Sequence, residues 1–238
     1  MFITNLISFR ISVIKEGAMV NKSLMKNIND VLAPKGGVKP AFSKYHIYLA
    51  LTKLVFEGPL GRKQLSHMLG IGEGSVRTLI RRLLNAKLVI TDPVAGVILT
   101  KEGLELAKYL VSRIIIVGDK EIDHNELCSN CKISLIVLRN GIKIIEKAGG
   151  VLYVRDLIVK KGGNGGLILY YIDNELKMPD TESLYPVSKS RLWEDLLKEH
   201  RLGNGDCILA SLCHRDDRDC MKYVVEAALD IIEVFENE

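Results

Sequence analysis

Two arginines, Arg77 and Arg81, lie four residues apart in a segment whose apolar residues recur at helical spacing. The apolar stripe predicts a helix over 73–86 with Val76, Leu79, Ile80, Leu83 and Leu84 inward. Both arginines then share an outward face, where a guanidinium can read guanine edges or clamp phosphate. Hydroxyls near the start of such a helix can contact phosphate or base edges. The candidate DNA contacts are therefore Ser75, Arg77, Thr78, Arg81 and Arg82; the alternative is an ordinary solvated helix face.

A second group of chemically capable residues lies near the middle of the chain. Arg155 and Asp156 are expected to begin a helix that ends in the run Lys160-Lys161-Gly162-Gly163-Asn164-Gly165-Gly166. Backbone N–H groups of such a loop can surround an anion, although this loop precedes a strand and matches no nucleotide-binding motif. The candidate effector-binding residues are Arg155, Asp156, Gly162, Gly163, Gly165 and Asp206. The alternative is a helix-to-strand turn beside a surface ion pair.

The five cysteines leave three interpretations open: incidental thiols, a metal site and a redox switch. Cys128 and Cys131 form a CxxC motif, but a zinc site needs a second closely spaced pair, and Cys213 and Cys220 are seven residues apart. Redox CxxC motifs usually open a helix, whereas this one leads into a predicted strand. We expect incidental cysteines, with no metal and no cofactor. No combination of nucleophile, base and orienting group is evident, so we do not expect an enzyme.

The N-terminal half has the periodicity of a small helical domain with one hairpin. A breaker-rich linker over 34–40 follows a short predicted helix over 21–32. The predicted elements after it are helices over 44–56, 62–69, 73–86 and 101–116, and two short strands over 88–91 and 97–99. Ser43 suits the N-cap of the first of these helices, and Gly70-Ile71-Gly72 forms a tight turn before the third.

Beyond residue 118 the pattern becomes a mixture of strands and helices. The expected strands cover 133–138, 142–145, 167–172, 176–179 and 208–212, and the expected helices cover 154–161, 190–200 and 221–235. In the first of these helices, Ile158 and Val159 are expected to point inward. Such a mixture over a hundred residues or more indicates a separate α/β or α+β domain.

The order helix, helix, glycine turn, helix, hairpin, helix, together with Leu69-Gly70-Ile71 and Ser75-Val76-Arg77, resembles the winged helix-turn-helix domains of many bacterial and archaeal regulators. In the other half, an Arg-Asp pair, a glycine-rich turn, a strand, an acidic turn and a short strand ending at Pro179 follow one another. This succession resembles a C-terminal domain of unassigned function found in archaeal winged-helix regulators, roughly over 130–235. The first resemblance implies DNA binding and the second implies effector sensing.

Charge divides along the chain in a way that fits this organisation. Residues 40–117 carry eleven Lys and Arg against five Asp and Glu, a balance of +6. Residues 118–238 carry sixteen against twenty-two, a balance of −6, so only the basic part is expected to meet a polyanion. We therefore predict an extension and linker over 1–40, a winged helix-turn-helix over 41–117 and an α/β domain over 118–238.

These patterns together predict a cytoplasmic, homodimeric regulator that binds double-stranded DNA and whose C-terminal domain senses a small molecule. An odd number of cysteines and the lack of a long uncharged apolar segment favour the cytoplasm, and we expect no membrane span. The helix over 101–116 ends in Ile114-Ile115-Ile116-Val117 and could join two copies, or it could pack on its own C-terminal domain. The alternative function is a metal- or redox-responsive protein, or an enzyme, that uses the winged helix for docking.

Overall fold

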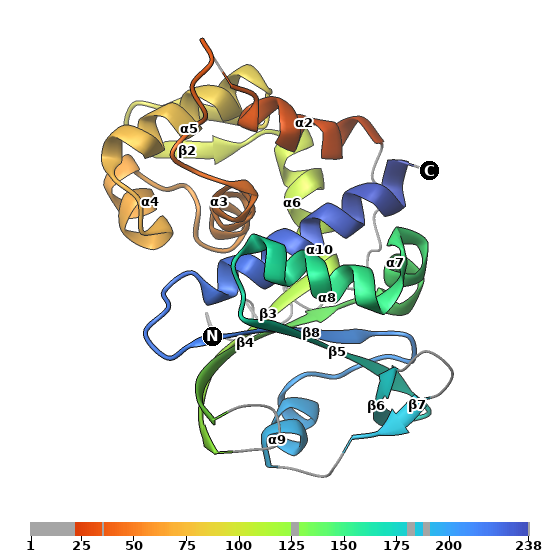
Figure 1. Ribbon diagram of the computed structural model, residues 1–238. Helices are drawn as coiled ribbons and strands as arrows, with labels where there is room; N and C mark the ends of the chain where they lie inside the picture. Colours follow the sequence, from red (N-terminus) through yellow and green to blue (C-terminus); the bar gives the residue numbers. More distant parts are fainter. Residues whose placement is uncertain (1–21, 35, 125–128, 180–183, 188–190, 238) are drawn as a thin grey trace, which may run out of the picture. The chain divides into compact units, whose positions relative to one another are not determined.

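The computed structural model describes residues 22–34, 36–124, 129–179, 184–187 and 191–237. The chain divides into two compact units, one ending at Ser112 and the other beginning at Arg113 (Figure 1). The second unit thus begins five residues before the boundary expected from the sequence. The predicted mixed α/β class is confirmed.

The first unit is mainly helical and contains one hairpin. Its elements in chain order are α2 (Lys22–Leu32), α3 (Lys44–Glu57), α4 (Arg62–Leu69), α5 (Glu73–Asn85), β1 (Val89–Asp92), β2 (Gly96–Leu99) and α6 (Lys101–Arg113). Each lies within three residues of its predicted range. The core is formed by fully buried aliphatic side chains from α3, α4, α5 and α6, among them Ile47, Leu51, Leu65, Leu79, Leu83, Leu106 and Leu110.

Two glycines permit the close turns of this unit. Gly70 ends α4 in the left-handed conformation, with φ +65°, so that α5 can begin three residues later. Gly103 lies against the start of the hairpin, where an added Cβ would lie 1.8 Å from the carbonyl oxygen of Leu88. The Thr100 hydroxyl accepts the N–H of Gly103 at 3.0 Å and so caps the start of α6. The first turn of α6 is thereby fixed against the hairpin.

The hairpin also pairs with one residue of the loop before α4. β1 and β2 pair in antiparallel fashion, and Leu60 adds a bridge in which it exchanges two backbone hydrogen bonds with Val97, at 3.2 and 2.9 Å. At the tip, the Asp92 carboxylate accepts the N–H groups of Val94 and Ala95. The hydrogen bond from Ala95, followed by that from Val94, lowers the pKa of Asp92. The helices and hairpin of this unit are consistent with a winged helix-turn-helix.

The second unit is built on one six-stranded antiparallel sheet in the order β3-β4-β8-β5-β6-β7. The strands are β3 (Ile114–His124), β4 (Ser129–Leu138), β5 (Gly165–Ile172), β6 (Glu175–Pro179), β7 (Leu184–Pro186) and β8 (Cys207–His214). The helices are α7 (Gly141–Ala148), α8 (Gly150–Lys161), α9 (Arg191–Glu199) and α10 (Cys220–Asn237). The sheet order brings β8, from the end of the chain, between β4 and β5.

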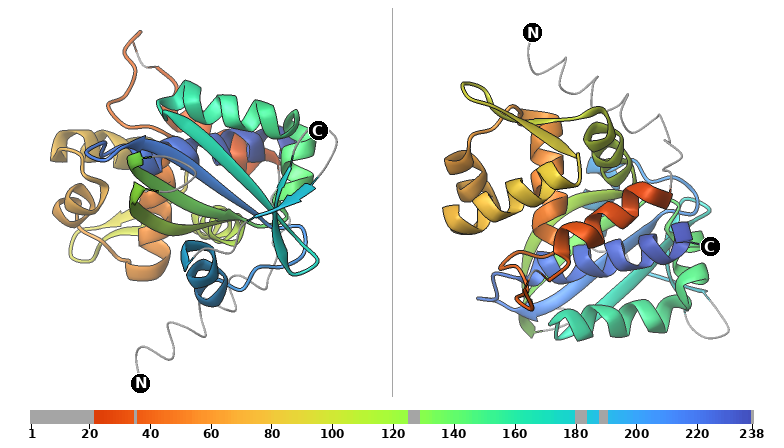
Figure 2. Two further views of the ribbon diagram at one scale, coloured as in Figure 1. Left: turned by 60° about the horizontal axis from the view of Figure 1, so that its bottom comes forward. Right: turned by 90° about the horizontal axis from the view of Figure 1, so that it is seen from above.

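Helices cover both faces of this sheet. α7, α8 and α10 lie on one face and α9 on the other (Figures 1 and 2). Trp193 and Leu196 of α9 pack with Ile133, Leu169 and Ile208, which are buried side chains of the three central strands. Side chains alternate along a strand, so the neighbouring buried residues of these strands point toward α8 and α10. Val224, Val225, Ala228, Leu229 and Ile232 of α10 are all 1% exposed or less.

The junction between the units differs from the sequence expectation. The helix predicted over 101–116 ends at Arg113, and Ile114 begins β3, where it pairs with Leu138 of β4. Three consecutive isoleucines and a valine suit a strand better than a helix, because branching at Cβ restricts their rotamers against the preceding helical turn. The prediction of helix for residues 114–116 was therefore wrong.

Three further predictions in the second unit were wrong. Residues 142–145 lie within the helix α7 and not in a strand; Ile144 and Ile145 are both buried there. The helix expected to begin near Arg155 begins at Gly150, so Arg155 and Asp156 lie in its middle. Ile158 is fully buried as predicted, whereas Val159 is 45% exposed.

Candidate functional site

The outward face of α5 carries the residues predicted to contact DNA. Arg77 and Arg81 are exposed, and Ser75 and Thr78 are partly exposed between them and the buried stripe. The Thr78 hydroxyl donates to the carbonyl oxygen of Gly74 at 3.2 Å, which leaves its lone pairs free to accept. The structure therefore brings four of the five predicted residues onto one accessible face.

The approach to this face is open at the start of the helix. An added Cβ on Gly72 or Gly74 would meet nothing within 4 Å, so a partner could come close to the backbone there. Glu73 is exposed in the first turn, and its carboxylate would oppose a phosphate at the helix N-terminus. The hairpin carries no Lys or Arg between residues 89 and 99, and its tip residue Val94 is 96% exposed.

Arg82 does not belong to this face, which corrects the sequence-based assignment. It is 5% exposed, and its Nη1 donates to the carbonyl oxygens of Val31 and Ala33 at 2.8 and 2.6 Å. Its guanidinium carbon lies 5.7 Å from the centre of the Phe42 ring. Val31 and Ala33 are at the C-terminal end of α2, where carbonyls lack partners within the helix. Arg82 is thus a structural cap for α2.

The apolar stripe of α6 also has a structural role. Leu106, Ala107, Leu110 and Val111 are buried within the chain. This burial agrees with a structural role inside the chain, and a dimer formed through the helix stays a prediction.

In the second unit, a cavity of about 680 Å³ opens between α8 and one end of the sheet. Of the residues predicted to bind an effector, Arg155, Asp156 and Gly165 line it. The remaining described lining residues come from β4, α8, β5 and β8 and from the loop before β5: Asn130, Cys131, Val159, Asn164, Gly166, Leu167, Leu212, Cys213 and His214. Its size is in the range of small-molecule sites.

The two charged groups of this cavity are well exposed. The side chain of Arg155 is 53% exposed and that of Asp156 is 71% exposed, with Nη2 and Oδ1 3.4 Å apart. Across the loop, Nδ2 of Asn164 lies 3.4 Å from Nε2 of His214. Leu212 and His214 were not predicted, because only the pairing of β5 with β8 brings them to Arg155.

The other glycines predicted to bind an effector end α8 and do not line the cavity. Gly162 has φ +131°, and an added Cβ would lie 2.6 Å from the ring of Tyr223. The N–H groups of Gly162 and Gly163 donate to the carbonyl oxygens of Val159 and Ile158 at 3.0 and 3.2 Å. Both N–H groups are therefore used by the helix end.

Asp206 is likewise structural, which corrects its assignment to the effector site. It is 5% exposed and forms an ion pair with Arg139. Its carboxylate also accepts the N–H groups of Asn140 and Gly203 at 2.9 and 2.7 Å. Asp206 thus holds together the turns before α7 and β8, and it is absent from the lining of the cavity.

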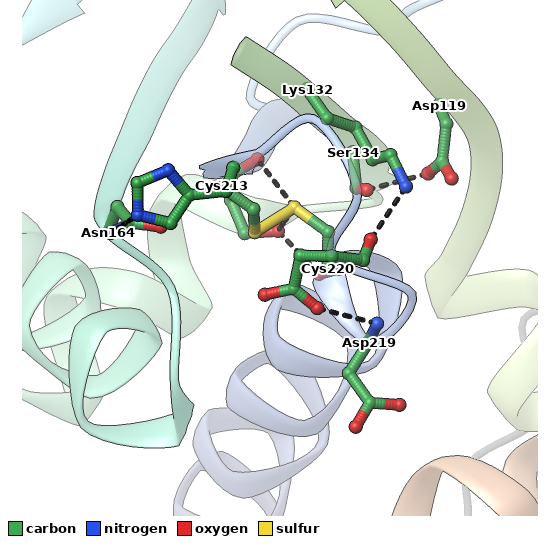
Figure 3. Close-up of a disulfide and its surroundings, with 10 residues drawn as sticks. Asp119, Lys132, Ser134, Asn164, Cys213, Asp219 and Cys220 are labelled. Carbon is green, nitrogen blue, oxygen red and sulfur yellow. Dashed lines mark hydrogen bonds between the residues drawn. A yellow bond between two sulfur atoms is a disulfide. The ribbon is translucent and has the colours of Figure 1, made fainter.

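The cysteines form a disulfide that the sequence did not predict. Cys213 and Cys220 are bonded, which joins the end of β8 to the start of α10 (Figure 3). Cys131 is also disulfide-bonded, while Cys128 lies outside the described residues. Cys207 is a free, buried thiol, and burial is the main reason that its pKa is raised. An unreactive thiol is expected there.

No group of three or more His, Cys, Asp or Glu among the described residues could hold a metal ion. A helix with the length and hydropathy of a bilayer span is likewise absent from the ranges described above.

Comparisons with known proteins agree with the division into two units. Residues 49–105 match the family model PH0730-like, N-terminal domain, and residues 129–231 match a domain of unknown function, DUF4443. A solved structure, the hypothetical protein PH0730 from Pyrococcus horikoshii OT3, is 25% identical, with a TM-score of 0.50. The match covers 81% of this chain and 97% of that chain. No curated protein matches. In its two parts, the chain is thus similar to the PH0730-like N-terminal domain and to the DUF4443 domain.

Proposed function

We propose that this protein is a transcription regulator that reads double-stranded DNA with α5. The observation that supports the proposal best is the position of Arg77 and Arg81. They share an exposed helix face opposite the buried stripe, in a segment with a balance of +6. Basic helices that follow a tight turn in this order of elements enter the major groove, where base edges are distinguishable.

The spacing of the two arginines suits neighbouring base pairs. Four residues advance an α-helix by about 6 Å, close to the rise of two base pairs at about 3.4 Å each. Each arginine can then donate two hydrogen bonds to the O6 and N7 of a guanine. Glu73 precedes them on the same helix, and a carboxylate can accept from the N4 amino group of cytosine. We therefore expect a recognition site with G·C pairs at its centre.

The cavity beside Arg155 is the proposed effector site of the regulator. It combines exposed charges with an apolar wall, as binding sites for small molecules do. The second unit carries a balance of −6, so it is expected to remain off the DNA while α5 is bound.

A redox-responsive regulator is the second candidate, and the disulfide favours it. Cys213 lines the cavity and is bonded to Cys220 at the start of α10. Breaking this bond would free one wall of the cavity from the helix. DNA affinity measured with and without a thiol reductant separates this candidate from one that responds to a small molecule alone.

Selection of binding sites from a randomised duplex pool tests the main proposal. The full chain should enrich a motif with central G·C pairs and bind it at least about 10³ times more tightly than an unrelated duplex. An Arg77→Ala, Arg81→Ala double variant should enrich no motif. Its fold should stay intact, because the structural Arg82 is unchanged. Equal affinity for all duplexes, or recovery of the same motif by the double variant, would refute the proposal.

A further inference from the structure

The cavity of the second unit has an unusual combination of walls. One side presents a cation and an anion from consecutive residues, Arg155 and Asp156. Another part of the lining is the exposed aliphatic side chain of Val159, one turn further along α8. Such a site suits a ligand that carries both charges at one end and an apolar group at the other.

The charged pair is available to a ligand. Within the described residues, the ion-pair partner of each is the other, at 3.4 Å, and both side chains are more than half exposed. An exposed pair of this kind contributes little to stability, so neither residue has an evident structural task. Arg155 can donate two parallel hydrogen bonds to a carboxylate, and Asp156 can accept from an ammonium group.

A phosphate-bearing ligand fits this cavity poorly. Arg155 is the one Lys or Arg among its described lining residues, and a phosphate brings no cation of its own to pair with Asp156 beside it. Nearby Lys161 is engaged with Asp230, 2.6 Å away. The glycine-rich loop cannot surround an anion either, because its N–H groups at 162, 163 and 164 already donate to backbone carbonyls.

The apolar wall indicates what the rest of the ligand is. Val159 is 45% exposed at the cavity although it lies on a helix packed against the sheet. The cavity of about 680 Å³ is large enough for a bulky side chain with water around it. Covering Val159 removes apolar surface from water and so favours binding.

We propose that this cavity binds an α-amino acid with a large apolar side chain. Its carboxylate lies on Arg155, its ammonium group on Asp156, and its side chain against Val159. The single carbon between the two charged groups of an α-amino acid matches their close placement on the protein. Only the role of the ligand as an effector rests on the proposed function. Binding of the amino acid itself requires no DNA.

Isothermal titration of the full chain with four probes tests the inference. L-Phenylalanine is compared with L-leucine, with 3-phenylpropanoate, which lacks the amine, and with 2-phenylethylamine, which lacks the carboxylate. L-Phenylalanine should bind at least about tenfold more tightly than either stripped analogue, because each analogue leaves one charge unpaired.

Two single substitutions make the test specific. Arg155→Ala should weaken L-phenylalanine at least about tenfold and leave 2-phenylethylamine unchanged, whereas Asp156→Ala should leave 3-phenylpropanoate unchanged. Arg218→Ala and Asp216→Ala are matched controls, because both residues are exposed in the same unit and lie outside the cavity lining. Both controls should bind like the wild type.

Several results would overturn the inference. They are the absence of binding of both amino acids at millimolar concentration, equal binding of the stripped analogues, and unchanged binding in both cavity variants. Displacement of L-phenylalanine by inorganic phosphate at equal concentration would also overturn it. None of these results bears on DNA recognition by α5, which is measured without any amino acid.

Discussion

Replacement of Arg82 by methionine tests whether this arginine has a structural role, unlike the two proposed DNA contacts on the same helix. The guanidinium of Arg82 holds two carbonyl oxygens at the end of α2, at 2.8 and 2.6 Å, and lies against the Phe42 ring. α2 has no basic residue in its last turn, so this contact from α5 supplies the positive charge there. Methionine keeps the apolar stem and removes both hydrogen bonds.

The cost can be worked from these contacts. A hydrogen bond to a charged donor contributes about 1.5–3 kcal/mol, and two bonds from one nitrogen are not additive. Within the described residues, Nε of Arg82 is buried without a partner, which reduces the net gain from the native arginine. We therefore expect the methionine variant to destabilise the docking of α2 by about 2–3 kcal/mol.

Hydrogen exchange of the α2 amides measures this loss locally. A change of 2–3 kcal/mol corresponds to exchange about 30- to 150-fold faster. Arg81→Met is the matched control, because Arg81 is adjacent in sequence but exposed, and its effect should stay within about 0.5 kcal/mol. If α2 exchanges at the same rate in the Arg82 variant and in the control, the structural role assigned to Arg82 is wrong.

Two other perturbations have expected outcomes. Gly103→Ala should lower the thermal melting temperature of the first unit strongly, because the added Cβ would lie 1.8 Å from the carbonyl oxygen of Leu88. Gly74→Ala is the control, because a Cβ there would meet no atom within 4 Å. It should be neutral or stabilise the unit by up to about 1 kcal/mol. Equal melting of these two glycine variants would contradict the packing described for α6. Reduction of the Cys213–Cys220 disulfide, which closes a loop across seven positions, should lower the free energy of unfolding by about 2.5 kcal/mol in urea titrations. A Cys213→Ala, Cys220→Ala variant should lose that part of the response, and an undiminished response would contradict the prediction.

The first unit was largely predictable because its signals are local. The apolar stripe of α5 and the left-handed turn at Gly70 lie within a few residues of the structures that they specify. Residues 114–116 were assigned to a helix because they continue the apolar pattern of α6. Their strand pairing depends on β4, about twenty residues later, which a local pattern does not show.

Short apolar runs caused the error at α7. Ile142, Ile144 and Ile145 fit a strand or one side of a helix equally well. The left-handed conformation of Asn140, whose N–H is held by Asp206, directs the chain into a helix instead. Because Asp206 is 66 residues away in the sequence, no local signal could have revealed this contact.

The candidate sites were predictable only where one element forms them. The exposed face of α5 follows from its own periodicity, yet Arg82 is buried because α2 returns to cover it from about fifty positions earlier. Arg155 and Asp156 were identified from their types. Their neighbours Leu212 and His214 depend on the placement of β8 beside β5, which only the sheet topology gives.

DNA affinity of the Arg77→Ala, Arg81→Ala double variant over a salt series tests the central claim most directly. On the selected site, fluorescence anisotropy should show a loss of at least about 30-fold, since each bidentate contact contributes about 1–3 kcal/mol. Affinity for an unrelated duplex should fall much less, and the thermal melting temperature should be unchanged because both side chains are exposed. A double variant that binds the selected site as tightly as the wild type at every salt concentration would contradict the assignment of α5 as the DNA-reading helix.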